Sequence, residues 1–253
     1  MITYAVCTLQ YDIDLNGLLS RRLSQCGCVC GLAAEGVTGE EPAAGERRVT
    51  VTLREGESLL RFAEALAMLL CRDLPYFELA AYTDALPLTL PEKRGTLRDA
   101  LREVRTCEEP AQILGGITAY LLEERRVNLE GYLRFRMRDA VERWREAADR
   151  AAAERLLRRE YAELLGTLGA YLQAQRPKAG ELALCLHPDG SCTLTDDSDA
   201  RIEYLDCSED GVLSLLVGMA PARLTVYDLS GGAADRLTGA LRRVFAGRVR
   251  IYR

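Results

Sequence analysis

Three cysteines at alternate positions form the most suggestive cluster of reactive side chains in the sequence. Cys26, Cys28 and Cys30 would lie on one face of the chain if this segment were a strand, and thiolates bind soft metals. A zinc knuckle usually has two residues between its cysteines and a second pair elsewhere, and this sequence has neither. We therefore favour small buried cysteines, and a metal or thiol site at these three residues is the alternative.

His187 is the only histidine, so a metal site built from several histidines is excluded. A catalytic dyad with Cys185 or Cys192 is conceivable, but no surrounding signature supports it. The residues that follow, Pro188-Asp189-Gly190, are typical of a tight turn. We therefore expect His187 to lie at the turn of a hairpin.

Two further segments resemble ligand sites only in part. Asp196, Asp197 and Asp199 form an acidic patch, yet the glycine and distal glutamate of a calcium-binding EF-hand loop are missing. Ser230-Gly231-Gly232 precedes an expected helix and could present backbone N–H groups to an anion, but no phosphate-loop or dinucleotide fingerprint occurs. An ordinary turn is the favoured interpretation of the glycine pair.

Arginines near the middle of the chain are the best candidates for binding. Between Arg125 and Glu160 there are 11 arginines and 7 acidic residues, which leaves the rest of the chain near −9. Such a segment could bind an acidic partner, a phosphate or an anionic surface, because guanidinium groups form bidentate hydrogen bonds with carboxylates and phosphates. Taken by itself, the excess of arginines favours a solvated helix stabilised by surface ion pairs, and binding is the alternative. Arg134 and Arg138 share a helix face, and Arg136 points elsewhere.

Composition limits the class of protein that carries these residues. The chain has 253 residues, 48% of them hydrophobic, which is enough for a substantial core, and its net charge of −5 argues against a general nucleic-acid binder. Nine scattered cysteines and an N-terminus without a signal-peptide pattern favour a reducing cytoplasm. The most apolar helical stretch, Leu59 to Cys71, is too short to cross a bilayer. We expect a cytoplasmic protein with no transmembrane segment and no cofactor.

The apolar pattern predicts an α+β fold with three parts: an α/β unit over 1–90, a helical region over 91–177 and a second α/β unit over 178–253. The first part should follow the order β-α-β-β, and the last should form a small mixed sheet covered on one face. The expected strands are Thr3–Gln10, Cys28–Leu32, Arg47–Leu53, Glu181–Leu186, Ser191–Thr195, Arg201–Leu205, Ala222–Asp228 and Arg248–Tyr252. The expected helices are Asp14–Cys26, Ser58–Asp84 with a bend near Pro75, Thr96–Cys107, Pro110–Arg126, Gly211–Met219 and Ala233–Phe245.

A long Arg-rich helical segment from Leu129 to Gln175 dominates the central region. Asn128 is placed to cap its first turn. Two apolar stripes run along the segment and fall out of phase near Ala151 to Ala153. The slip predicts either a bend or two helices that meet different surfaces.

The run from Asn128 to Met137, Asn-Leu-Glu-Gly-Tyr-Leu-Arg-Phe-Arg-Met, resembles the hallmark segment of the YtxC-like sporulation proteins of endospore-forming Firmicutes. The resemblance extends through Glu160-Tyr161, the helix end at Pro177 and the stretch from Leu213 to Pro221, which is roughly the second half of the chain. It implies a cytoplasmic protein linked to sporulation, and it supplies no established reaction, cofactor or catalytic residue.

Our leading hypothesis is a non-enzymatic interaction or regulatory protein of endospore formation that docks a protein partner with the region from Tyr132 to Trp144. Gly131, near a helix start, predicts either close packing of another backbone or a notch for a partner, because glycine is unfavourable in helices. A thiol- or metal-dependent enzyme that uses the cysteine cluster and a nucleic-acid binder that uses the basic helix are the alternatives. The expected binding residues are Glu130, Gly131, Tyr132, Arg134, Phe135, Arg136 and Arg138.

Overall fold

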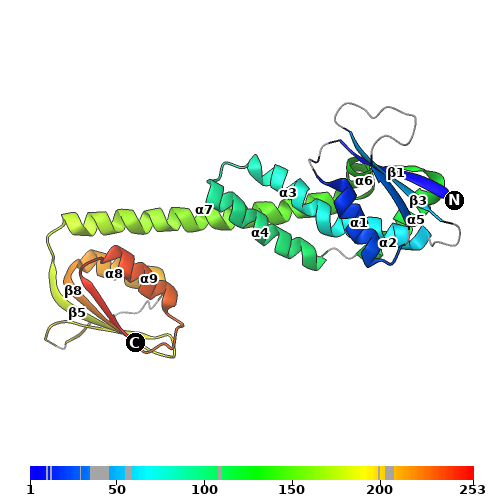
Figure 1. The fold of residues 1–253 in the computed structure, drawn as a ribbon. Coiled ribbons are helices and arrows are strands. Elements are labelled where there is room, and N and C mark those ends of the chain that lie inside the picture. Colours follow the sequence, from blue (N-terminus) through cyan, green and yellow to red (C-terminus); the bar gives the residue numbers. More distant parts are fainter. Residues whose placement is uncertain are drawn as a thin grey trace. The chain divides into compact units, whose positions relative to one another are not determined.

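The computed structural model describes residues 1–9, 11, 13–28, 30–34, 46–54, 59–107, 110–198, 200–202 and 208–253. Within it the chain forms two compact units, Met1–Arg155 and Leu156–Arg253, each with its own hydrophobic core. Both units combine helices with a sheet, so the predicted α+β class is confirmed (Figure 1). The three-part division at residues 90 and 177 stays a prediction.

The first unit contains a four-stranded sheet in the order β2-β3-β1-β4. Its strands are β1 (Ile2–Thr8), β2 (Cys30–Ala34), β3 (Arg47–Leu53) and β4 (Arg126–Asn128). β3 pairs antiparallel with both β1 and β2, whereas β4 runs parallel to β1, with Val6 opposite Val127. The sequence pattern predicted β1, β2 and β3 but assigned Arg126 to a helix, because three residues are too few to show a strand period.

Helical segments complete the first core, and α1 (Leu15–Gln25) and α6 (Leu129–Arg136) are the helices that contact the sheet most. The helical segments before β4 are α1, α2 (Leu59–Met68), the π-helical turn η1 (Leu69–Asp73), α3 (Leu74–Asp84), α4 (Leu90–Cys107) and α5 (Pro110–Glu123). Asp14 caps α1 by accepting a hydrogen bond from the Gly17 amide at 2.9 Å. The π-helical turn η1 joins α2 to α3 just before Leu74, and its backbone hydrogen bonds link residues five apart instead of four. The bend expected near Pro75 stays a prediction.

The long segment consists of α6 (Leu129–Arg136) and α7 (Arg138–Ala174), separated at Met137. The expected junction of two helices near Ala151 to Ala153 is wrong, because α7 is continuous there, and the alternative of a bend stays a prediction. Alanine has the highest helix propensity, so this run favours an unbroken helix. The two apolar stripes instead meet two cores: Trp144 packs in the first, and Leu165 and Leu172 pack in the second.

The second unit has a five-stranded sheet in the order β7-β6-β5-β8-β9. Its strands are β5 (Ala179–Leu186), β6 (Cys192–Thr195), β7 (Arg201–Ile202), β8 (Pro221–Asp228) and β9 (Val249–Tyr252), and its helices are α8 (Glu209–Met219) and α9 (Asp235–Val244). β5, β8 and β9 are parallel, while β6 and β7 are antiparallel to their neighbours. Residues 203–205, which we expected to extend β7, lie outside the described residues.

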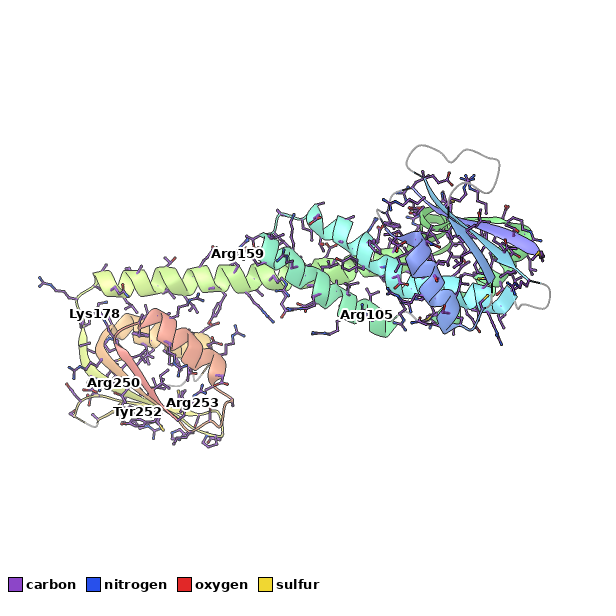
Figure 2. All side chains as sticks on the ribbon, viewed as in Figure 1. Arg105, Arg159, Lys178, Arg250, Tyr252 and Arg253 are labelled. Atoms are coloured by element: carbon purple, nitrogen blue, oxygen red, sulfur yellow. The ribbon has the colours of Figure 1, made fainter. Side chains whose placement is uncertain are left out.

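One face of this second sheet is covered, as predicted. α8 and α9 lie on the same side of the strands (Figure 1), and alternate residues such as Leu184 and Val226 face the core. The opposite face presents Tyr227 and Tyr252, whose rings stack at 5.6 Å between centroids. Figure 2 places Tyr252 beside the chain end on the strand that carries Arg250. No helix in the described ranges has both the length and the apolar composition needed to span a membrane.

Candidate docking site at the α6–α7 junction

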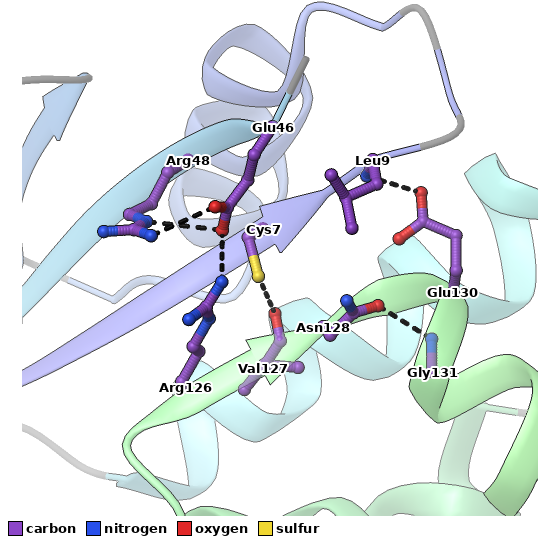
Figure 3. A network of polar contacts seen from close by, with 9 residues as sticks. All are labelled: Cys7, Leu9, Glu46, Arg48, Arg126, Val127, Asn128, Glu130 and Gly131. Atoms are coloured by element: carbon purple, nitrogen blue, oxygen red, sulfur yellow. Dashed lines mark hydrogen bonds and ion pairs between the residues drawn. The ribbon is translucent and has the colours of Figure 1, made fainter. Parts of the chain in front are cut away.

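The start of α6 is fixed by the sheet beside it. β4 pairs with β1 and leads directly into the helix, and the Asn128 side chain accepts a hydrogen bond from the Gly131 amide at 2.8 Å (Figure 3). This interaction satisfies one of the free N–H groups of the first turn, so the predicted cap is confirmed.

Glu130 is part of the protein interior rather than of an open surface. Glu130 is only 5% exposed, and its Oε1 accepts a hydrogen bond from the Leu9 amide at 3.0 Å (Figure 3). The same oxygen accepts a second hydrogen bond from the Thr8 hydroxyl. Thr8 is the last residue of β1, and Leu9 follows it directly. The carboxylate therefore joins α6 to the first strand of the chain.

Tyr132 is also a packing residue. It is 7% exposed, and its ring meets the ring of Tyr120 on α5 edge-on at 5.5 Å between centroids. Burial raises the pKa of the Tyr132 hydroxyl, partly offset by the positive charge of Arg136. Both observations assign Tyr132 to the contact between α5 and α6.

A second buried carboxylate reinforces the neighbouring strands. Glu46 is almost fully covered and forms ion pairs with Arg48 at 3.1 Å and with Arg126 at 2.6 Å (Figure 3). The Cys7 thiol donates a hydrogen bond to the Val127 carbonyl at 3.5 Å. Burial raises the pKa of this thiol, and Arg126 opposes the shift. The network holds β4 in place, and α6 with it.

The end of α6 carries the exposed members of the predicted set. Phe135 is 85% exposed, and its neighbours in the sequence, Arg134, Arg136 and Arg138, are exposed as well. Met137 leaves helical geometry at φ −122° and ψ 27°, so the chain turns between α6 and α7 at this point. We call Arg134, Phe135, Arg136 and Arg138 the Phe135 surface.

The seven predicted binding residues therefore divide into two groups. Glu130, Gly131 and Tyr132 hold α6 against the sheet and α5, while the Phe135 surface faces solvent. Arg138 also pairs with Glu142 at 2.9 Å on α7, and both side chains of this pair are mostly exposed. Such a pair contributes little to stability, so it leaves the guanidinium available to a stronger acidic partner.

Gly131 lies beneath the capping side chain. A Cβ atom added to it would lie 3.4 Å from Oδ1 of Asn128, and the two next nearest atoms also belong to that side chain. The expected close approach of another backbone is therefore wrong. A Cβ atom at this position would be in ordinary van der Waals contact with the Asn128 side chain that caps the helix.

Replacing Gly131 by alanine is expected to change the free energy of unfolding by less than about 1 kcal/mol, in the stabilising direction, because alanine is the better helix former. Urea unfolding of both proteins measures this difference. A clear destabilisation would mean that the capped turn cannot accept a side chain.

The cysteine cluster does not form one face. Cys26 ends α1, Cys28 is buried in the connection that follows, and Cys30 begins β2. Burial, followed by the charge of Glu64, raises the pKa of the Cys26 thiol, which lowers the fraction of reactive thiolate. Across the described ranges, no group of three or more His, Cys, Asp or Glu residues is arranged to hold a metal ion.

The hairpin in the second unit has the predicted turn. The His187 amide donates to the Ser191 carbonyl at 2.9 Å, and Gly190 has a φ of +83°. The imidazole contacts Thr193 Oγ1 at 3.0 Å and lies 3.9 Å from the Cys185 sulfur. The ring thus lies over the hairpin that bears it.

The two remaining candidate segments act as local turns. Asp196 accepts hydrogen bonds from Ser198 and from the Ala200 amide, while Asp199 lies outside the described residues. Ser230 accepts from the Ala234 amide at 3.0 Å at the start of α9. Gly231 and Gly232 both have positive φ, as such a turn requires.

The fold and the exposed α6 end define an α+β protein with a solvent-facing aromatic and basic surface. A model of the YtxC-like family matches residues 89–250, from the start of α4 to β9, so the chain belongs to the YtxC-like family. A search of the curated proteins and a search of the solved structures each found no match.

Proposed function

We propose that this YtxC-like protein is a non-enzymatic interaction protein of endospore formation, which acts in the cytoplasm and binds an acidic protein partner through the Phe135 surface. The observation that carries the proposal is the 85% exposure of Phe135 between three exposed arginines. The family membership supports the sporulation setting through the resemblance described above.

The physical argument rests on what each side chain gains on binding. Burying a phenylalanine side chain contributes about 1.5–3 kcal/mol, and none of this is gained while Phe135 faces water. Arginine and aromatic residues are the types that most often dominate binding energy at interfaces. The guanidinium groups select a carboxylate-bearing partner over a neutral one. The net charge of −5 disfavours nucleic acid as that partner.

The test compares the proteins captured from sporulating cells by the tagged wild-type chain and by a double variant, Phe135→Ala with Arg136→Glu. Loss of an aromatic anchor together with a charge reversal is expected to weaken binding by at least about 2 kcal/mol, or roughly 30-fold. The affected partner should disappear from the captured set and should show the weaker affinity when purified.

A matched control variant makes the same two types of substitution at exposed positions outside the Phe135 surface. Leu157→Ala with Arg158→Glu also removes an exposed apolar side chain and reverses an adjacent exposed arginine, on α7. This control should retain every partner. If the folded Phe135 variant also retains every partner, the proposal is wrong.

A further inference from the structure

A groove between α3 and α4 is lined by a row of cationic side chains. It encloses about 680 Å³. Tyr76 on α3 and Leu97 and Leu101 on α4 form its apolar part. The remaining lining residues are all arginines of α4, namely Arg94, Arg98, Arg102 and Arg105, which we call the arginine ridge.

Charge is sorted around the circumference of α4. In a helical projection with about 100° per residue, the four arginines of the ridge lie within an arc of roughly 80°, and Leu97 and Leu101 lie beside this arc. The acids Asp99 and Glu103 lie farther round and form ion pairs with Arg155 and Arg150 of α7. The acidic face of α4 therefore packs toward α7, and the ridge faces the groove. Figure 2 shows Arg105 at the C-terminal end of α4.

The ridge is poorly neutralised within the protein. For the residues that the structure describes, no ion pair involves Arg94, Arg102 or Arg105, and Arg98 reaches only its exposed neighbour Asp99 at 3.6 Å. Arginines four positions apart on a helix repel one another. A bound anion with matching spacing would relieve this repulsion.

The ridge and the apolar strip beside it point to a helical occupant. The arginine ridge covers 12 residues of helix, and its first and last members are 11 steps, or about 16 Å, apart, at intervals of four, four and three. A second helix laid along α4 repeats its own side chains at the same steps, so acidic residues on it can meet successive arginines. Its apolar face would cover Leu97, Leu101 and Tyr76.

We propose that the α3–α4 groove binds an acidic amphipathic helix of a protein partner, with carboxylates on the arginine ridge and apolar side chains on Leu97, Leu101 and Tyr76. A single-stranded nucleic acid fits less well, because the groove offers one aromatic ring for stacking and the chain carries a net charge of −5. This groove is separate from the Phe135 surface, which lies on α6 and the first residue of α7.

The test uses a fluorescein-labelled synthetic peptide with glutamates at the spacing of the ridge and leucines on the adjoining face. A scrambled peptide of the same composition keeps the charge but loses the amphipathic face. Fluorescence anisotropy at low and moderate salt gives both affinities. We expect the patterned peptide to bind about tenfold more tightly than the scrambled one, with affinity that falls as salt rises.

The matched variants separate the groove from general charge effects. Arg98→Glu with Arg102→Glu should weaken binding of the patterned peptide about tenfold or more. Arg242→Glu with Arg243→Glu makes the same charge change at two exposed arginines of α9 and should leave the affinity within about twofold. Circular dichroism verifies that each variant is folded.

Several results would overturn the inference. These are equal binding of the patterned and scrambled peptides, absence of measurable peptide binding, or an undiminished affinity of the ridge variant. Tighter binding of a single-stranded oligonucleotide than of the peptide, lost in the ridge variant, would also overturn it and would assign the groove to nucleic acid. Because the ridge variant keeps the Phe135 surface intact, its behaviour is independent of the function proposed above.

Discussion

Replacing Trp144 by alanine is expected to lower the free energy of unfolding of the first unit by about 3–5 kcal/mol. Trp144 is 1% exposed and is the largest fully buried side chain of the core formed by residues 1–155. It lies on α7, so its removal leaves a large cavity where this helix meets the rest of that core. Urea unfolding followed by circular dichroism measures the loss, because the variant has no tryptophan left to report by fluorescence.

Phenylalanine at the same position is the control. The Trp144 indole N–H is buried and finds no hydrogen-bond partner among the described residues, so Trp144→Phe removes no hydrogen bond that the structure shows. It also removes an unsatisfied donor, which is itself unfavourable. We therefore expect a smaller loss than with alanine. Equal losses for the two variants would contradict this account and would mean that the indole N–H makes a stabilising contact.

Replacing Glu130 by alanine is the second large effect that we expect. The buried Thr8 hydroxyl would lose its acceptor, at a cost of about 1–3 kcal/mol, and the partly buried Leu9 amide would lose its acceptor as well. The first unit should unfold at a lower denaturant concentration, and hydrogen exchange of the Leu9 amide should become faster. Intrinsic fluorescence follows this variant, because Trp144 lies in the same core.

Glu130→Gln distinguishes the hydrogen bonds from the charge. Glutamine keeps a side-chain oxygen that can accept from Leu9, so it should recover a large part of the stability that alanine loses. Under conditions where the Glu130→Ala protein is still folded, this alanine variant should bind the partner of the Phe135 surface with unchanged affinity. Loss of that partner without any loss of stability would contradict the structural role and return Glu130 to the binding residues.

Local pattern was sufficient for the elements whose determinants lie close together in the chain. The predicted bounds of β3 match the structure because Val49, Val51 and Leu53 alternate with polar residues. Asn128 caps α6 three residues before the amide that it binds. The His187 turn likewise depends on its immediate neighbours, among them Gly190 with its positive φ.

The long helical segment shows where local pattern becomes ambiguous. The slip near Ala151 to Ala153 records a change in which core the helix meets, and the two compact units divide close by, after Arg155. A change of partner and a break in the backbone produce the same sequence signal. The actual break at Met137 left no such signal, because Met137 is buried and continues the apolar stripe.

The arginine ridge of α4 was not singled out from the sequence, although its spacing of four, four and three residues is visible there. Most basic residues in the whole chain are arginines, so an isolated arginine does not by itself indicate a binding site. Two facts that only the fold supplies give the ridge its importance. Asp99 and Glu103 pair with arginines of α7, and Tyr76 of α3 lines the groove opposite α4.

The sequence by itself determined the cap at Asn128 and the hairpin at His187, because the residues that form each lie near one another in the chain. It also indicated the α+β class and the family, because apolar periodicity and motifs can be recognised without knowledge of long-range contacts. The tertiary structure decided which residues of the segment from Glu130 to Arg138 are buried. Glu130 is covered because the last residue of β1 and the residue after it, more than 100 residues away, supply its two hydrogen-bond donors. Phe135 stays exposed to solvent because, within the described residues, no helix or strand covers the end of α6.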